Sequence, residues 1–395
     1  MYNLSIEYKG NTQPWITPVE SRIAYLMKSN SKKKCIIIYE QPDSSTFRYR
    51  GYNMYQVLKQ SERWNAVYFF LNELDKISFL LNRVQMVILS RTRWNQRLQK
   101  FINEIKQREI PLAFDVDDCV FDLDNLQILA STQNINLEDS EMELNYWFAY
   151  ITRMSYVAGQ ADVFLSTNDY LGAKLSKKFG KKSVSIPNFF NEEQLLFSEK
   201  CCELKKVSKL NDKFVIGYFS GSPSHENDFL VAYQDILYLM QKYDNIYLYV
   251  AGYMNFSQEA QEMIEKKRIR TLPFVDFVNL QRYIAEVDVN IVPLVENTFT
   301  NCKSELKFFE SAIVDTITCA SPTYTYKSSI KDGVNGFLCS PNEWYDKIEK
   351  IYLNQLPVED IVRSAHKYAM ENYYGENILK QVENGYDKLL IEIIH

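Results

Sequence analysis

VDVNIVPLVENTFTNCKSELKFFE, residues 287–310, joins an apolar run typical of a strand to a segment typical of a helix. A small polar patch starts the helix, and Lys303 and Lys307 are four residues apart, so they share one face. Glu310 follows three residues after Lys307. Free backbone amides at a helix start, together with a lysine charge, favour a bound diphosphate. An ordinary amphipathic helix with a solvated face has the same pattern, so the choice depends on the rest of the chain.

Short apolar runs alternate with helix-length segments on both sides of this stretch. In the first half we predict strands at residues 34–40, 66–71, 84–90, 110–116, 161–167 and 182–188. In the second half we predict strands at residues 213–220, 245–252, 269–275, 287–294 and 316–322. Helices are predicted between several of them, at residues 94–108, 169–179, 225–242 and 279–286, and from 343 onward. This alternation is typical of parallel βαβ units whose sheets are covered on both faces.

A polar stretch, SEKCCELKKVSKLND (198–212), interrupts the alternation and has the composition of an interdomain connection. We therefore predict an α/β domain over residues 1–205 and a second over 206–370. A last helix, over 371–395, is expected to cross back to the first domain. Ligands of open α/β sheets bind at the carboxyl ends of the strands, so two such domains facing each other would form a binding cleft.

Composition narrows the function classes. The chain has 395 residues, of which 46% are hydrophobic, and its formal net charge is −5, which argues against non-specific binding of nucleic acid. The seven cysteines form no repeated CxxC pair, which argues against a zinc site or a disulfide framework and for reduced thiols. No apolar run approaches the ~20 residues of a membrane span. We expect a soluble, cytoplasmic protein.

A second anion-binding pattern lies in FVIGYFSGSPSHENDF (214–229), where a strand runs into small residues and then a helix start near His225. Small residues such as Gly221 and Ser222 let the backbone approach an anion. An ordinary turn that needs glycine for a positive φ is the alternative. For His225, capping of the helix, contact with a phosphate and acid–base chemistry all stay open.

Together these patterns resemble the nucleotide-binding half of retaining GT-B glycosyltransferases of the family-4 kind (glycosyl transferases group 1). The order and spacing hold over roughly residues 213–350, and the first loop is similar to the family's Gly-Ser-x-x-His-x-x-Asp form. The matching positions are Val287-Asp288-Val289, Pro293, Asn301, Lys303, Ser304, Lys307, Glu310, Pro322, Tyr326, Ile330, Asp332 to Leu338, and Trp344.

The resemblance implies a GT-B fold, with two Rossmann-like domains facing across a cleft, and a role for single residues. Glu310 looks like the family's ribose-binding glutamate, and Lys303 looks like part of the diphosphate clamp. The other donor-binding residues that it implies are Gly221, Ser222, His225, Phe274, Val275, Asn301, Ser304 and Lys307, with Phe274 and Val275 at the base. The chain departs from the family at Cys302, where many members carry a glutamate. It also lacks the Arg/Lys pair of the first loop, for which Lys303 is the expected substitute.

An acidic cluster, PLAFDVDDCVFDLD (111–124), ends a predicted strand of the first half. Three interpretations compete: a metal-holding DxD, an aspartyl-phosphate loop with Asp115 as nucleophile and Asp117 as acid, and the cleft wall of a GT-B first domain. We favour the cleft wall, where Asp115 or Asp117 would orient the acceptor hydroxyl or stabilise positive charge at the anomeric carbon. A purely structural loop stays open.

Two basic segments complete the candidates. In QPDSSTFRYRGYNM (41–54), Arg50 is a candidate contact for an acceptor or phosphate, with a solvated arginine as the alternative. LSRTRWNQRLQKF (89–101) has the residues of a basic helix that could lie on anionic lipid, and family members dock at membranes through the first domain. A solvated helix face is the favoured interpretation there.

The resemblance implies a retaining hexosyltransferase with a nucleoside-diphosphate sugar as donor and a glycan or lipid-linked glycan as acceptor. It implies no cofactor, no metal and no nucleic acid, and suggests bacterial surface polysaccharide synthesis, with an optional peripheral contact to the inner membrane face. Two other classes stay open. One is an inactive GT-B scaffold or partner subunit, which Cys302 permits, and the other is an Mg²⁺-dependent phosphatase that uses Asp115 and Asp117.

Overall fold

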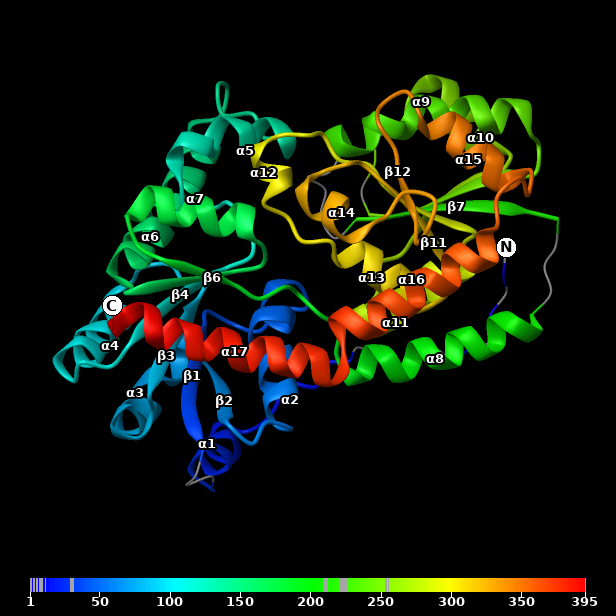
Figure 1. Ribbon diagram of the computed structural model, residues 1–395. Coiled ribbons are helices and arrows are strands. Elements are labelled where there is room, and N and C mark those ends of the chain that lie inside the picture. The colour runs from blue at the N-terminus through cyan, green and yellow to red at the C-terminus, as the bar shows by residue number, and fades with distance from the viewer. Residues whose placement is uncertain are drawn as a thin grey trace.

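The computed structural model describes residues 2, 4, 6, 10, 12–28, 32–208, 212–220, 226–252, 254 and 256–394. These residues form two parallel six-stranded sheets with helices packed around each (Figure 1). The first sheet has the strand order β2-β1-β3-β4-β5-β6. Its strands are β1 (Lys33–Tyr39), β2 (Trp64–Phe70), β3 (Met86–Ser90), β4 (Leu112–Val116), β5 (Val163–Ser166) and β6 (Ser183–Ser185).

The second sheet has the order β12-β11-β10-β7-β8-β9, and its strand pairs are also parallel. Its strands are β7 (Phe214–Phe219), β8 (Ile246–Ala251), β9 (Ile269–Leu272), β10 (Val289–Val292), β11 (Ile317–Ala320) and β12 (Phe337–Leu338). Eleven of these strands overlap predicted runs, and the two-residue β12 is the one that periodicity could not reveal. The prediction of two parallel α/β sheets is confirmed.

Helices cover both faces of each sheet. Those of the first domain are α1 (Val19–Lys28), α2 (Met54–Leu58), α3 (Leu74–Ile77), α4 (Gln96–Gln107), α5 (Leu126–Thr132), α6 (Glu141–Gln160) and α7 (Asp169–Phe179). The side chains of Asn95, Ser140 and Asn168 accept hydrogen bonds from the first turns of α4, α6 and α7. Because such caps satisfy otherwise unpaired amides, they explain where these helices begin.

The remaining helices follow the crossing to the second sheet. They are α8 (Glu192–Val207), α9 (Glu226–Lys242), α10 (Gln261–Glu265), α11 (Phe277–Glu286), α12 (Thr298–Asn301), α13 (Leu306–Ala312), α14 (Tyr324–Ser329), α15 (Trp344–Tyr352), α16 (Val358–Tyr373) and α17 (Gly375–Ile394). In the part of the chain that the structure describes, none of these helices combines the length and apolar character of a membrane span.

The chain reaches the second domain through residues 186–191, ahead of the polar stretch that we expected as the connection. Most of that stretch belongs to α8, which packs along α11 by burying residues such as Phe197 and Cys201. The predicted boundary near residue 205 therefore falls at the carboxyl end of a helix that lies on the second domain. The buried residues of α8 are separated by charged ones, so the segment has the composition of a polar connection although it forms a helix.

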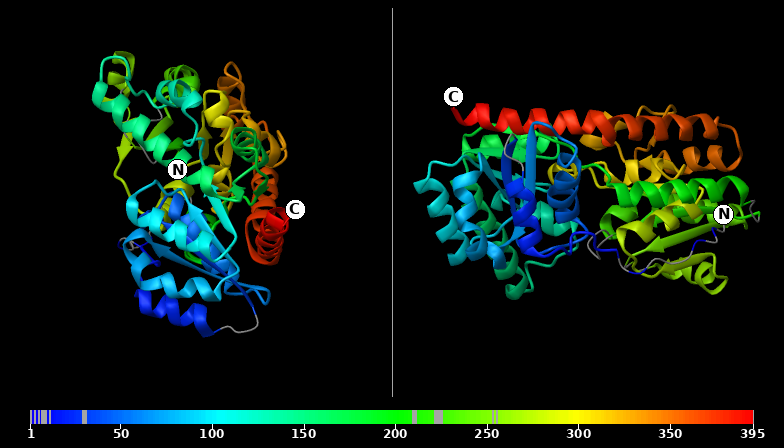
Figure 2. Two further views of the ribbon diagram at one scale, coloured as in Figure 1. Left: turned by 90° about the vertical axis from the view of Figure 1, so that its left-hand side faces the viewer. Right: turned by 90° about the horizontal axis from the view of Figure 1, so that it is seen from below.

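Both ends of the chain pack on the domain to which they do not belong by sequence. The helix α17 runs from α16 onto the first domain, where it packs on α2, β5 and β6, and the two helices form a long rod beside both domains (Figure 2). At the other end, the amide of Leu4 donates to Glu286 Oε1 at 3.3 Å, and Trp15 stacks on Phe277 with ring centroids 5.7 Å apart. Each domain is thus contacted by the end of the chain that belongs by sequence to the other, and we call these two segments the exchanged ends.

Candidate active site

The carboxyl ends of β3 and β4 face those of β7 and β10. Directly across this gap, Lys303 Nζ lies 3.6 Å from Asp118 Oδ1. Beside it, α5 approaches α12, and Asn297 Nδ2 donates to Thr132 Oγ1 at 2.9 Å (Figure 1). The strand ends that the sequence predicted to form a cleft are therefore in contact across it.

Asp115 and Arg50 form a buried ion pair away from the cleft. Arg50 donates to both carboxylate oxygens of Asp115 at 2.8–3.1 Å, Ser90 Oγ donates to Oδ2 at 2.9 Å, and both charged side chains are fully buried. Arg50 also donates to the carbonyl oxygen of Ile186 at 2.8 Å. Burial raises the pKa of Asp115 and the guanidinium of Arg50 opposes that shift.

This geometry corrects two expectations. Asp115 does not line the cleft wall, and Arg50 is not placed to receive an acceptor or phosphate, because each has the other as its partner. An aspartyl-phosphate enzyme needs a carboxylate oxygen that is free to attack, and both oxygens of Asp115 are occupied. Asp115 lies within β4, whose five residues are all buried, whereas Asp117 follows the end of the strand.

Asp117 and Asp118 follow the end of β4 with side chains 13% and 21% exposed, and Arg91, which sequence analysis placed in a helix, contacts both. Arg91 Nη1 donates to Asp117 Oδ1 at 2.8 Å and lies 3.7 Å from Asp118 Oδ2. Thr46 Oγ1 donates to Asp117 Oδ2 at 2.7 Å. Arg91 has a φ of 47°, a strained left-handed conformation that is concentrated at functional sites. The sequence signal that could have identified Arg91 is its position directly after the predicted strand that forms β3.

The basic segment expected as a membrane-facing or solvated helix is divided among ion pairs. Besides Arg91, Arg93 pairs with Glu40 at 2.5 Å and Arg97 pairs with Asp75 at 2.9 Å. The helix α4 begins only at Gln96, so Arg91 and Arg93 lie on the loop before it.

The lysines of residues 301–310 occupy two different surroundings, because the predicted single helix is broken. The helix α12 ends at Asn301 and α13 begins at Leu306, which leaves Lys303 in the turn between them. Lys303 Nζ lies 4.5 Å from the ring centroid of Phe299. Lys307 Nζ lies 5.2 Å from that of Tyr218, and burial lowers the pKa of Lys307 to about 8.

Asn301 and Ser304, also predicted to bind the donor, have hydrogen-bond partners within the protein. Asn301 Oδ1 accepts from the amide of Tyr324 at 2.8 Å, and Ser304 Oγ accepts from Asn188 Nδ2 at 3.0 Å. Gly221, Ser222 and His225, predicted in the first phosphate loop, lie outside the described residues.

Glu310 lies at the boundary between the domains with an exposed fraction of 2%. Its Oε1 accepts hydrogen bonds from Tyr49 Oη at 2.7 Å, Arg48 Nη2 at 3.2 Å and Gln194 Nε2 at 3.3 Å. Within the described chain, no side chain donates to Oε2, and the buried atoms Arg48 Nη1 and Gln194 Oε1 have no partner. An incompletely satisfied buried cluster of this kind indicates a place for a polar ligand or water.

Arg48 is a second residue that sequence analysis passed over, in favour of Arg50. Both lie in a short π-helix, Arg48–Asn53. Residues two apart in a helical segment point in nearly opposite directions, so one arginine enters the first domain and the other reaches Glu310 of the second. In the sequence, Arg48 and Arg50 alternate with aromatic residues. This pattern does not indicate which of the two arginines points toward the second domain.

Phe274 and Val275, predicted near the base, line a cavity of about 480 Å³ together with Trp15, Asp43 and Ser44. Arg48 Nε donates to the carbonyl oxygen of Ser44 at 2.8 Å, which connects this cavity to the cluster around Glu310. Phe274 is 57% exposed.

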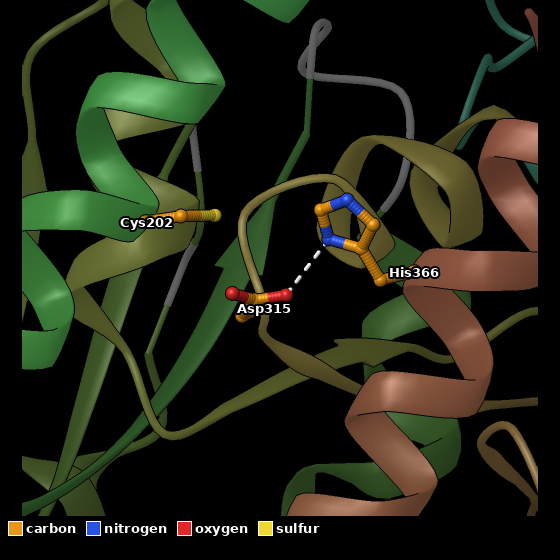
Figure 3. A group of neighbouring side chains, drawn as sticks. All are labelled: Cys202, Asp315 and His366. Carbon is orange, nitrogen blue, oxygen red and sulfur yellow. Dashed lines mark hydrogen bonds and ion pairs between the residues drawn. The ribbon is translucent and has the colours of Figure 1, made fainter.

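A separate group of potential metal ligands lies on α8, α16 and the turn before β11 (Figure 3). His366 Nδ1 lies 2.8 Å from Asp315 Oδ1, and Cys202 completes the group. Although burial opposes it, the contact with His366 lowers the pKa of Asp315. Lys205 Nζ donates to the carbonyl oxygen of Asp315 at 2.6 Å. Because a lysine already supplies a positive charge there, we interpret the group as an ion pair that fastens α16.

The second domain is similar in sequence to a known family. Residues 213–354 match the family described as Glycosyl transferases group 1. Among curated protein sequences, none matches the chain significantly.

Solved structures share the fold of the whole chain. Anabaena Alr3699/HepE in complex with UDP and glucose superposes with a TM-score of 0.57 at 12% identity, over 90% of this chain and 100% of that one. A glycosyltransferase from Rickettsia africae ESF-5 gives 0.58 at 14% identity, over 92% and 99%. Sucrose-phosphate synthase from Thermosynechococcus elongatus gives 0.58 at 13% identity, over 91% and 100%. The chain has the two-domain α/β GT-B fold, as predicted.

Proposed function

We propose that this protein is a glycosyltransferase that moves a hexosyl group from a nucleoside-diphosphate sugar to a hydroxyl of a glycan or lipid-linked glycan, with retention. One observation carries the proposal. The segment that matches the glycosyltransferase family carries Lys303, Lys307 and Glu310, and Lys303 Nζ lies 3.6 Å from Asp118 Oδ1 of the opposite domain. The family resemblance alone suggests a cytoplasmic role in bacterial surface polysaccharide synthesis.

The donor would lie along the second domain. In this proposal the diphosphate contacts Lys303 and Lys307, whose charges offset those of the leaving group. The ribose hydroxyls reach the open Oε2 of Glu310 and the unpaired Nη1 of Arg48, and the base enters the cavity at Phe274. UDP is the first nucleotide to test, because Alr3699/HepE was solved with UDP.

The chain's own cations support a reaction without a metal. Asp117 and Asp118, the carboxylates that face the cleft, already have Arg91 and Lys303 as partners. In the proposed step the acceptor oxygen bonds to the anomeric carbon on the face that the diphosphate leaves. The bond to the diphosphate breaks, and the acceptor proton passes to the leaving phosphate oxygen. Asp117 or Asp118 would orient the acceptor hydroxyl.

A thermal-shift panel of UDP, GDP, dTDP, ADP and CMP, each with EDTA or Mg²⁺, tests the donor site. A ligand at 100 times its Kd adds about 2.7 kcal/mol of stability. We expect one nucleoside diphosphate to stabilise the protein equally in EDTA and Mg²⁺. A shift that requires Mg²⁺ would contradict the metal-free proposal, and no shift with any nucleotide would contradict the donor site.

A GT-B scaffold without activity is the second candidate, and Cys302 favours it. This residue is fully buried, its thiol contacts that of Cys119, and its carbonyl oxygen accepts from Asn168 Nδ2 at 2.9 Å. Position 302 therefore serves the contact between domains, where many family members carry a glutamate. Glu310→Gln discriminates: lost nucleotide affinity supports the transferase, and unchanged affinity supports the scaffold.

A further inference from the structure

The helix α6 carries exposed aromatic side chains. Tyr146 and Tyr156 are 53% and 58% exposed. The rings of Tyr146 and Tyr150 have centroids 6.1 Å apart, and so do those of Trp94 and Tyr156. We call these four residues the aromatic strip. Aromatic rings with this much exposure, grouped on one side of a helix, are typical of a binding surface.

The aromatic strip is continuous with the charged residues of the cleft. Arg91 Nε lies 3.4 Å from Tyr150 Oη, and the same guanidinium holds Asp117. The guanidinium of Arg93 lies 4.8 Å from the ring centroid of Tyr150. A chain of contacts therefore runs from Lys303 and Asp118, through Arg91, to the exposed rings. A molecule bound on the strip would have its end at the proposed reaction centre.

The chemistry of the strip favours carbohydrate over lipid. Tyrosine and tryptophan combine an apolar ring face with a polar group, which suits the alternating C–H faces and hydroxyls of pyranose rings. The first turn of α6 carries Glu141 and Glu143, so its charge repels an anionic membrane. Three basic side chains lie beside the strip: Arg91 pairs with Asp117 at 2.8 Å, Arg93 pairs with Glu40 at 2.5 Å, and Arg153 of α6 donates to the carbonyl oxygen of Trp94 at 2.8 Å.

We infer that the aromatic strip of α6 is an oligosaccharide-binding subsite that holds the acceptor chain and leads its end into the cleft. This inference rests on the proposed function for the direction of transfer. Binding of the sugar chain itself depends only on the strip.

The helix offers a matched control. Phe148 is 51% exposed, nearly the same as Tyr146, and lies two residues from it, so these two side chains point to nearly opposite sides of the helix. Its ring makes no contact with the strip among the described residues. Removal of Phe148 therefore removes a similar exposed ring from the side of the helix opposite to Tyr146.

The test compares Tyr146→Ala, Tyr156→Ala and Phe148→Ala with the unchanged protein on an array of defined oligosaccharides. We expect the unchanged protein to bind a subset of them. Tyr146→Ala and Tyr156→Ala should each weaken binding about tenfold, which corresponds to about 1.4 kcal/mol, because each variant removes one ring contact. Phe148→Ala should bind as the unchanged protein does. Absence of oligosaccharide binding, or equal loss in all three variants, would overturn the inference.

Two further measurements separate the outcomes. Vesicles of phosphatidylglycerol and phosphatidylethanolamine test whether the protein binds lipid. If it binds these vesicles, and Phe148→Ala reduces this binding as much as Tyr146→Ala does, the carbohydrate subsite is overturned. The UDP thermal shift is measured on each variant. If Tyr146→Ala and Tyr156→Ala lose oligosaccharide binding but keep the UDP thermal shift, the result supports the subsite. If they keep both, the subsite is overturned and the donor proposal stands. Oligosaccharide binding without any nucleotide shift would support the subsite and contradict the proposed transferase.

Discussion

The two domains meet through two interfaces of different character. On one side, the exchanged ends bury aromatic and aliphatic side chains, and the ion pair Arg50–Asp115 is sealed beside the crossing segment. On the cleft side, the contacts include charged groups with unmet hydrogen-bonding capacity, such as Arg48 with Glu310, and the partly exposed pair of Lys303 with Asp118. Separating the buried apolar surfaces would expose them to water at a cost in free energy, whereas a ligand of suitable charge can replace one partner of a charged contact. The first interface therefore supports the fold, and the second is available for function.

The largest expected effect comes from breaking the sealed ion pair. Arg50→Met leaves Asp115 buried without its partner, which should lower the free energy of unfolding by about 3–5 kcal/mol in urea denaturation. Arg50→Met combined with Asp115→Leu should recover most of this loss, because no charge stays buried. If Arg50→Met costs less than about 1 kcal/mol, the pair does not support the fold.

A similar loss is expected where α17 packs on the first domain. The ring of Tyr386 is fully buried, with its centroid 5.4 Å from that of Trp64. Tyr386→Ala should cost about 3 kcal/mol through the cavity it leaves. The hydroxyl of Tyr386 is buried without a partner, so Tyr386→Phe should be neutral or stabilising. Equal destabilisation by both variants in urea denaturation would show that the hydroxyl, not the packing, matters.

On the cleft side, affinity for UDP should depend on pH through Lys307. Burial lowers the pKa of Lys307 to about 8, so its amine is charged below pH 8 and loses its charge as the pH rises above it. The affinity for UDP, measured by calorimetry, should therefore fall about tenfold for each pH unit above 8. Lys307→Arg keeps its charge throughout and should remove this slope. The same slope in that variant would assign the pH dependence to another group.

The smallest effect is expected at Lys303. The contact with Asp118 is 3.6 Å long, and the two side chains are 18% and 21% exposed. Lys303→Met should change the free energy of unfolding by less than about 1 kcal/mol. A loss above about 2 kcal/mol in the same urea measurement would place Lys303 with the supporting interface, and would contradict the distinction drawn between the two sides.

Several features of the site could be predicted from sequence because they are local. The acidic run after β4, the polar turn after β10 and the cationic positions 303 and 307 are each adjacent to a strand end, and parallel strands bring their carboxyl ends to one edge. Which aspartate of the run faces the cleft could not be predicted. Asp115 and Asp117 differ by their partners, Arg50 and Arg91, and those partners lie tens of residues away in the chain.

The sequence by itself determined the two parallel α/β sheets and the place of the lysine-bearing segment after β10, since strand and helix periodicities arise from consecutive residues. Only the tertiary structure decided the break between α12 and α13, the choice of Arg48 over Arg50 at the cleft, and the exchange of the two chain ends. These features depend on which distant surfaces bury each other and which charges pair. Burial and pairing are properties of neighbours in space, and the order of residues along the chain does not record them.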